Sequence, residues 1–450
     1  MPPSAKTPPP LFRDPSFWGM SISQFLGAFN DNQFKQIVLL LFVAAPLGEK
    51  GAAVDLQWLA TFFFGLPFIL FSGYAGYLSD RFSKWTVIFN SKLAETFIMA
   101  GGAVAFYFYS QNGLTLNLVI GLTALVFLMG AQTAFFGPGK YGVLPELLQD
   151  HDLPAANGFF LMTTFLAIIF GTFLGAGLLD WFPKHLWIAG LICMAIGGVG
   201  SAAILWVRKT PPAQANLKFH PSSLAIPHEI LLLLQKDRPL LAAAMASSVF
   251  WGVAAVVQMA VTSLGENELH LKPVYTGLMF STVSVGIAVG SVSAGWFSKN
   301  RFSAGVLQVG IWGMVVCLAL LALPGPGGDN WFGGWENLQQ EQKQGVVGNH
   351  LLGYWGSIPI LILLGGFTGL FAVPLQVFLQ SRPPKKLKGQ MIATQNLLNW
   401  IAIIASAGLY PAVDLTLRAW NLPVYGMFWA CMIVTLMLAL TYRPKDQPLD

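Results

Sequence analysis

The chain has 450 residues, of which 55% are hydrophobic and 10% are charged, and its formal net charge is +5. Soluble domains carry about a quarter charged residues, so this composition excludes an ordinary soluble protein, whose surface needs more polar side chains. The three cysteines lie far apart in apolar runs, which leaves no pattern for a disulfide framework, a metal site or a bound cofactor.

Apolar runs long enough to cross a bilayer as helices, at about 20 residues each, occur twelve times. The first six are Phe17–Ala45, Leu56–Leu78, Trp85–Tyr109, Leu116–Phe136, Gly158–Leu179 and Leu186–Val207. The last six are Leu240–Leu264, Tyr275–Phe297, Val306–Leu323, Leu352–Phe378, Met391–Val413 and Val424–Thr441. The sequence therefore predicts an all-α polytopic membrane protein with twelve transmembrane helices, in two six-helix bundles at residues 1–207 and 240–450.

The polar stretch 208–239 is predicted to be a cytoplasmic linker between these bundles. Within it, His228–Arg238 has the pattern of an amphipathic helix on a membrane surface. Most of the 25 Lys and Arg residues fall on the side of the membrane that would hold this linker and both termini. Because cytoplasmic loops collect basic residues, both termini are expected in the cytoplasm. The positive net charge then follows from topology and implies no nucleic-acid partner.

Four charged residues fall within the predicted spans, and all are in the N-terminal half. Asp31 and Lys35 lie in the first span, and Lys92 and Glu95 lie in the third. A charge at membrane depth costs several kcal/mol unless it is paired or hydrated, so each is a candidate functional residue. The alternative is structural, because residues three or four apart share a helix face and each pair could neutralise itself.

The first span also has a polar face, formed by Gln24, Asn30, Asp31 and Asn32. Lipid does not tolerate such a face, so it must line a cavity or contact neighbouring helices. The predicted spans of the C-terminal half contain no charged residue, only scattered amides such as Gln376, Gln395 and Asn399. One polar wall and one apolar wall suit an amphiphilic substrate with a charged end.

The first and second halves share a short motif after their second span, in Gly76–Lys84 and Gly295–Ser303. The first copy resembles the G-x-x-x-D-R-x-x-R/K motif of the major facilitator superfamily, which implies that fold and a gating role for Gly76, Asp80, Arg81 and Lys84. A carboxylate beside two cations can cap a neighbouring helix and latch the inner side. A tight turn with topology-setting cations is the alternative, although it does not explain Asp80. Lys299 replaces the carboxylate in the second copy, so the two gates should differ.

Longer matches cover most of the chain and are more specific. Ser23–Lys35, Gly130–Leu147, Gly369–Gln376 and Lys388–Thr394 resemble the bacterial lysophospholipid transporter family (LplT type). The resemblance implies transfer of lysophosphatidylethanolamine and lysophosphatidylglycerol from the outer to the inner leaflet of a bacterial cytoplasmic (inner) membrane by alternating access, for reacylation. The expected substrate-binding residues are Gln24, Asn30, Asp31, Lys35, Lys92, Glu95, Gln132 and Lys140. Lys140 can also be read as a cation that favours the C-terminal end of its helix.

No enzyme motif is present: the sequence has no H-x-x-x-x-D acyltransferase pattern, no nucleophile elbow and no phosphate loop. We therefore expect a non-enzymatic carrier, and we expect it to be a monomer. The resemblance to the lysophospholipid transporter family implies a functional link to a separate acyltransferase/acyl-carrier-protein synthetase. One alternative is a proton-coupled exporter of amphipathic drugs or other small solutes, with Asp31 and Glu95 as proton sites. Another is a non-transporting scaffold that presents membrane lipid to a soluble acyltransferase through its basic inner loops.

Two GxxxG motifs, Gly171 with Gly175 and Gly286 with Gly290, predict close helix packing. In the superfamily that the chain resembles, the two helices that carry them meet across the halves. Packing within one half is the alternative.

Overall fold

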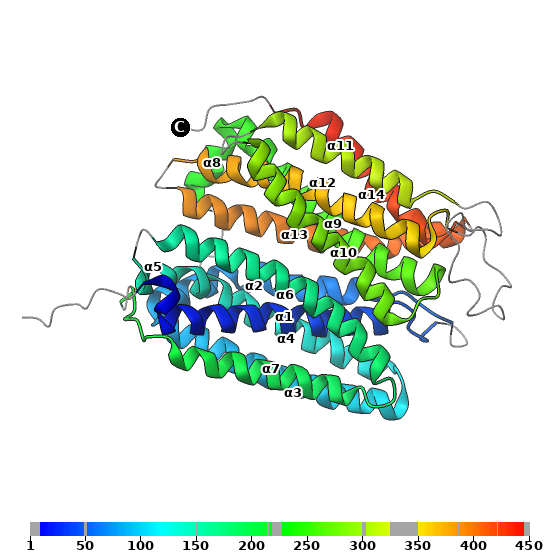
Figure 1. Ribbon diagram of the computed structural model, residues 1–450, viewed down its shortest axis with the longest axis horizontal. Coiled ribbons are helices and arrows are strands. Elements are labelled where there is room, and N and C mark those ends of the chain that lie inside the picture. The colour runs from blue at the N-terminus through cyan, green and yellow to red at the C-terminus, as the bar shows by residue number, and fades with distance from the viewer. Residues whose placement is uncertain are drawn as a thin grey trace, which may run out of the picture. The chain divides into compact units, whose positions relative to one another are not determined.

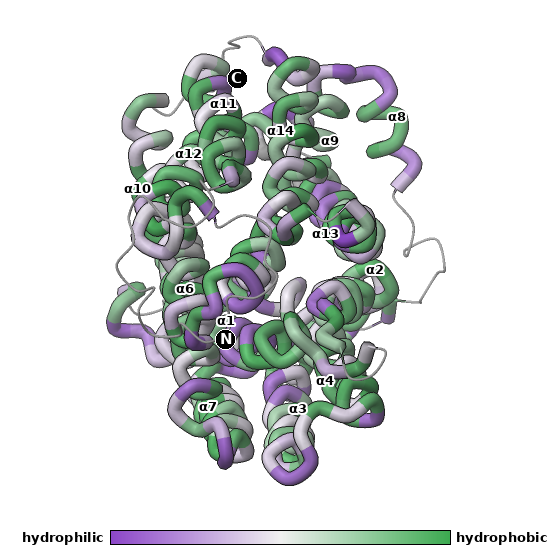
Figure 2. The backbone as a smooth tube through the Cα atoms, turned by 90° about the vertical axis from the view of Figure 1, so that its right-hand side faces the viewer, coloured by the Kyte–Doolittle hydropathy of each residue, from purple (hydrophilic) through white to green (hydrophobic). Residues whose placement is uncertain are grey.

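The computed structural model describes residues 10–48, 52–149, 152–213, 216–217, 227–298, 303–324, 350–384, 387–420 and 422–444. Within these ranges the chain is almost entirely helical and forms no named strand. The long helices (Figure 1) are α1 (Pro15–Phe42), α2 (Gln57–Arg81), α3 (Lys84–Asn112), α4 (Leu116–Gly142), α6 (Leu153–Trp181), α7 (Trp187–Ala203), α9 (Arg238–Ser263), α10 (Pro273–Ser298), α11 (Ala304–Leu321), α12 (Gly353–Ser381), α13 (Lys388–Ala419) and α14 (Met427–Thr441). Figure 2 shows these helices nearly end-on, with hydrophobic residues in many of their visible turns. The predicted all-α membrane fold is confirmed.

In the described ranges, 11 helices are long and apolar enough to cross a membrane. The remaining long helix, α1, spans 28 residues but carries amides and charges between Asn30 and Gln36, which lower its mean hydropathy. The structure is therefore consistent with the predicted twelve spans. Several helices extend beyond the predicted limits, so Glu266, Glu268, Asp414 and Arg418 fall within helical spans. The prediction that the C-terminal spans contain no charged residue is wrong at these helix ends.

The chain divides into two compact units. Unit 1 comprises residues 1–35, 66–171 and 181–225, and unit 2 comprises residues 36–65, 172–180 and 226–450. Parts of α1, α2 and α6 thus belong to unit 2. The predicted linker lies partly outside the described residues, but its amphipathic segment forms α8 (His228–Lys236), which buries Ile230 and Leu234. The predicted domain limits stay a prediction.

Local sequence explains the sharp turn between α3 and α4. Gly113 adopts a positive φ of 69° and its N–H donates to Tyr109 O at 2.8 Å, which ends α3. Glycine has no β-carbon and takes this conformation without strain. Two residues later, the Thr115 side chain accepts a hydrogen bond from Leu118 N and begins α4. The two helices are therefore held as a close antiparallel pair.

In unit 1, α3 packs along α7 and against α4, and α3 and α7 run side by side in Figure 1. Glycines permit the close approaches. A β-carbon on Gly190 of α7 would clash with Ala103 of α3, and one on Gly171 of α6 would clash with the Phe29 carbonyl of α1. The motif glycine Gly171 thus packs against a helix of its own unit.

In unit 2, α10 packs most extensively against α12. A β-carbon on Gly286 or Gly290 of α10 would clash with the backbone of α12, and one on Gly365 of α12 would clash with Val283 O. Small residues let membrane helices approach closely because the backbones themselves make contact. Gly286 and Gly290 therefore serve packing within one unit, as the alternative interpretation held, while α6 meets α10 elsewhere, where Gly277 faces Ala176.

Candidate functional site

Unit 1 contains a buried charged cluster, which we define as Asp31 of α1, Lys92 and Glu95 of α3, and Lys140 of α4. Asp31 is 8% exposed, and Lys92 and Glu95 are each 1% exposed. Lys140 is half-buried near the end of α4 and interacts electrostatically with Asp31. The structure thus brings together charges that are separated by more than a hundred residues in the sequence.

The Asp31 carboxylate accepts hydrogen bonds from two neighbouring side chains of α4. Gln132 Nε2 donates to Oδ1 at 3.3 Å, and Thr133 Oγ1 donates to Oδ2 at 2.9 Å. Gln132 was expected at the site, whereas Thr133 was not. Lys35 is half-buried in α1, one turn after Asp31.

Lys92 and Glu95 form a buried ion pair with each other. The second oxygen of Glu95 accepts from Asn30 Nδ2 at 3.0 Å, and Lys92 Nζ lies 5.7 Å from the centre of the Phe136 ring. Gly27 makes room for the lysine, because a β-carbon there would lie 2.7 Å from Lys92 Nζ. The structural alternative, in which the two residues neutralise each other, is realised for this pair.

Gln24 lies in a different environment from the charged cluster. Its Nε2 donates to Thr163 Oγ1 of α6 at 2.6 Å, and its Oε1 accepts from Thr164 Oγ1 at 3.1 Å. These hydrogen bonds of Gln24 connect α1 to α6. Of the expected substrate residues, Asn30, Asp31, Lys92, Glu95 and Gln132 are joined by the contacts described above.

The predicted gate residues lie where α2 ends and α3 begins. The Arg81 guanidinium contacts the Tyr77 hydroxyl and lies 5.7 Å from the centre of that ring. The Asp80 side chain is exposed and makes no hydrogen bond or ion pair with any described residue. A β-carbon on Gly76 would meet nothing within 4 Å. The expected cap of Asp80 on a neighbouring helix is therefore not formed in this structure, and the gating role stays a prediction.

Lys84 has a different role from the other gate residues. It forms an ion pair with Glu146 of α5 (Leu144–Leu147), and its side chain is 9% exposed. A second ion pair at the same end of unit 1 joins Arg208 to the fully buried Asp14 at 2.7 Å. Arg208 also donates to Leu147 O at 2.7 Å. Through Arg208, which follows α7, these contacts connect α5 to Asp14, which precedes α1. No sequence pattern predicted them.

Unit 2 has a buried neutral network, which we define as Ser247 of α9, Gln376 of α12, and Gln395 and Asn399 of α13. Gln395 Nε2 donates to Ser247 Oγ at 3.2 Å and to Gln376 Oε1 at 3.0 Å. With its amide oxygen turned toward Trp251 Nε1 (3.3 Å), Asn399 donates to Ser247 Oγ at 3.2 Å. The amides that looked scattered in the sequence therefore converge on one place.

A further carboxylate, Asp55, is buried just before α2, outside the membrane-spanning segments, and is 4% exposed. It accepts from Gln57 N at 2.9 Å, from Gln57 Nε2 at 3.0 Å and from Tyr410 Oη of α13 at 2.9 Å. Burial raises the pKa of Asp55 from 3.8 to about 6, partly offset by these hydrogen bonds. No sequence pattern predicted this contact, because Tyr410 is 355 positions away.

Comparison with known proteins agrees with this architecture. The model of the Major Facilitator Superfamily matches residues 17–407. A lysophospholipid transporter LplT of Klebsiella pneumoniae subsp. pneumoniae is 28% identical over 396 residues, or 86% of each chain. One of Serratia proteamaculans is 26% identical over 414 residues, or 91% of each chain.

Solved structures of other transporters share the fold. The peptide transporter POT in complex with sulfate superposes with a TM-score of 0.66 at 13% identity, covering 97% of this chain and 96% of that one. A variant of the nucleoside transporter NupG gives a TM-score of 0.64 at 11% identity, covering 94% and 98%. Since the family match extends over most of the sequence and the helical architecture agrees with it, the chain belongs to the major facilitator superfamily.

Proposed function

We propose that this protein is a lysophospholipid transporter, which moves lysophosphatidylethanolamine and lysophosphatidylglycerol from the outer to the inner leaflet of a bacterial cytoplasmic membrane by alternating access. The observation that carries the proposal is the charged cluster of unit 1, which lies at membrane depth. The corresponding polar residues of unit 2 form the neutral network. The relatives named as lysophospholipid transporters support the substrate class.

The cluster offers both charges that a phosphoethanolamine head requires. The Asp31 carboxylate suits the ammonium group, and the half-buried Lys140, together with Lys35, suits the phosphate. Charged heads cross hydrocarbon slowly because they lose their hydration, and fixed partners of opposite charge replace that water. The acyl chain needs only apolar surroundings. In this scheme Lys92 and Glu95 act as positioning residues, since they are paired with each other.

Reconstituted transport tests the proposal. The purified protein is placed in liposomes, a fluorescent lysophosphatidylethanolamine is added to the outer leaflet, and its protection from an impermeant quencher is followed with and without an ion gradient. We expect inward transfer by the wild-type protein and loss of that transfer in Asp31→Asn, which keeps the shape of the side chain but removes its charge.

The matched control is Glu229→Gln on α8, which removes one negative charge from an exposed position and should leave transfer unchanged. Equal transfer by wild-type protein and Asp31→Asn would contradict the head-group site. Binding of the lipid without transfer would instead favour the scaffold function.

One observation favours a second candidate, a proton-coupled exporter. Asp31 accepts hydrogen bonds from the neutral donors Gln132 and Thr133. Among the described residues it forms no ion pair that would have to break before the carboxylate takes up a proton. Carboxylates at membrane depth serve as proton relays in many transporters. Export of an amphipathic dye that stops when the proton gradient is collapsed, with no lysophospholipid transfer, would favour this candidate.

Both termini face the cytoplasm, as the distribution of basic residues indicates. Gly76, Asp80, Arg81 and Lys84 form the inner gate, and Asp80 gains its partner in another state of the transport cycle. The carrier is a monomer that supplies lysophospholipid to a separate acyltransferase.

A further inference from the structure

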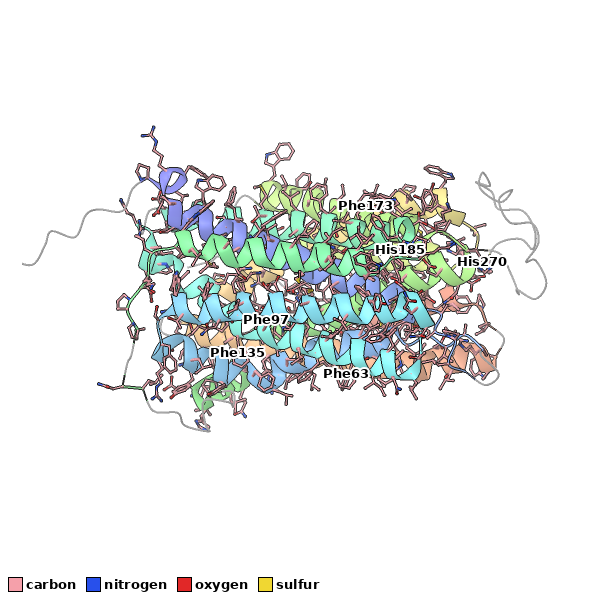
Figure 3. All side chains as sticks on the ribbon, turned by 90° about the horizontal axis from the view of Figure 1, so that it is seen from below. Phe63, Phe97, Phe135, Phe173, His185 and His270 are labelled. Carbon is pink, nitrogen blue, oxygen red and sulfur yellow. The ribbon has the colours of Figure 1, made fainter. Side chains whose placement is uncertain are left out.

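A groove runs along α3 and α4, away from the charged cluster, and has a volume of about 510 Å³. Its apolar wall includes Val104 and Phe108 of α3 and Leu125 and Leu128 of α4. Both helices face the viewer in Figure 3, where Phe97 is labelled on α3, and Phe97 is 69% exposed. This side of α3 therefore has exposed apolar side chains at membrane depth.

The two ends of the groove differ in polarity. Its mouth lies at the α3–α4 turn and is lined by Asn112, Thr115 and Asn117, which are all exposed. The Asn112 and Asn117 amides make no hydrogen bond with any described residue. Asn112 is the last residue of its membrane-spanning helix, which places it at the level where lipid head groups begin. No charged residue lines the groove.

Glycine keeps the groove open. A β-carbon on Gly121 of α4 would meet nothing within 4 Å, although this glycine lines the groove. The space over Gly121 is therefore empty of protein atoms. A volume of about 510 Å³ lies within the range of roughly 300–1,000 Å³ that is usual for small-molecule sites.

We propose that this groove binds one acyl chain of a diacyl phospholipid, with the Asn112 and Asn117 amides donating hydrogen bonds to its ester carbonyls. A surface at membrane depth is bathed in bilayer lipid, so the most abundant lipid fills it by mass action. The uncharged mouth provides nothing that would select a rare head group. On the predicted topology this end of unit 1 lies in the outer leaflet. The site does not depend on the proposed function.

The surrounding bilayer limits the affinity of the groove for an acyl chain. An acyl chain gains no hydrophobic free energy when it leaves other chains for the protein, so close packing and the hydrogen bonds at the mouth must hold it. Filling the groove with a protein side chain should therefore be tolerated by the fold while it excludes the lipid chain. Gly121→Leu is such a change, since nothing stands where its side chain would begin.

Photocrosslinking tests the site directly. The full chain is reconstituted in phosphatidylethanolamine and phosphatidylglycerol liposomes that contain a diacyl phosphatidylethanolamine with a diazirine on one chain. After illumination, labelled residues are mapped by mass spectrometry. We expect labelling at Val104, Phe108 and Leu125 in wild-type protein, and loss of that labelling to the level of an unilluminated sample in Gly121→Leu.

The matched control is Gly198→Leu on α7, where a β-carbon also meets nothing within 4 Å, and which should leave labelling unchanged. A second variant, Asn112→Ala with Asn117→Ala, changes only exposed residues and should weaken the same labelling. The proposal is overturned if label spreads evenly over all exposed helices. It is also overturned if a diazirine-labelled lysophosphatidylethanolamine displaces the diacyl lipid from the groove, because the occupant would then be the substrate.

Discussion

The charged cluster of unit 1 and the neutral network of unit 2 are both polar groups at membrane depth, but only the first carries charge. Unit 1 holds an ion pair between Lys92 and Glu95 and a carboxylate, Asp31, with two neutral donors. Unit 2 holds the neutral network, in which Gln395 contacts Ser247 and Gln376. A polar group at membrane depth costs free energy unless it has a partner. The comparison shows that one chain meets this requirement with opposite charges in one place and with amides and hydroxyls in another.

The difference matters for recognition. A charge acts on a charged head over several ångströms in a medium of low dielectric constant, whereas an amide acts only at hydrogen-bond distance. Substitutions in the charged cluster should therefore change stability and substrate preference strongly, and those in the neutral network should act weakly.

The largest effect is expected from Glu95→Gln, which leaves Lys92 buried at 1% exposure without its counterion. Breaking a buried ion pair costs about 3–5 kcal/mol. Thermal unfolding, followed by tryptophan fluorescence in detergent, should show a large loss of stability. The double variant Lys92→Met with Glu95→Gln keeps an acceptor for Asn30 and should recover most of that loss. An unchanged unfolding temperature in the single variant would show that the pair contributes little.

Unit 2 has a titratable carboxylate of its own, Asp55, outside the spans. Burial raises its pKa from 3.8 to about 6, so protonated Asp55 is favoured in the folded state. The resulting stabilisation is complete below the ordinary pKa and is lost as the pH rises through about 6, with a total on the order of 3 kcal/mol. The difference in unfolding free energy between wild type and Asp55→Asn, measured across this pH window, should follow that curve. A difference that does not vary with pH would contradict it.

An intermediate effect is expected from Thr133→Val, which removes a donor to Asp31 while keeping the side-chain shape. Hydrogen bonds to charged groups contribute about 1.5–3 kcal/mol. Thr123→Val on the same helix is the matched control, because the Thr123 hydroxyl is buried without a partner in the described structure. Unfolding temperatures should fall for the first variant and stay level or rise for the second. Equal shifts would rule out a special role for the Asp31 contact.

The smallest effect is expected from Gln376→Met in the neutral network. Gln395 keeps its hydrogen bond to Ser247, so only one neutral bond is lost, at about 0.5–1.5 kcal/mol. Unfolding measurements and lysophospholipid transfer should both stay close to wild type. If this variant is as damaging as Glu95→Gln, the contrast between the units fails.

The sequence predicted the helices well, because hydropathy over a span is a local property. α3 was expected at Trp85–Tyr109 and forms at Lys84–Asn112. α13 was expected to end near Val413 but continues to Ala419. There Asp414 and Arg418, four residues apart, form an ion pair at 2.8 Å, and a hydropathy scan does not register such pairing.

The candidate site was predicted less completely. Charged residues in spans are conspicuous, so Asp31 and Glu95 could be identified from the sequence. Thr133 could not, since a hydroxyl on a membrane helix often bonds to its own backbone. The contact between Asp55 and Tyr410 depends on how distant helices pack, which no local pattern contains.

The glycine contact between α10 and α12 has a consequence for biosynthesis. The two helices are not neighbours in the sequence, because α11 lies between them. At roughly 5–20 residues per second, the ribosome needs several seconds to complete α12 after α10 has emerged. During that interval the bare backbone around Gly286 and Gly290 faces lipid or the insertion machinery instead of its partner. A bulky residue at Gly365 would therefore prevent α12 from packing against α10. Quality-control proteases would then degrade the misfolded chain before any transport could be measured.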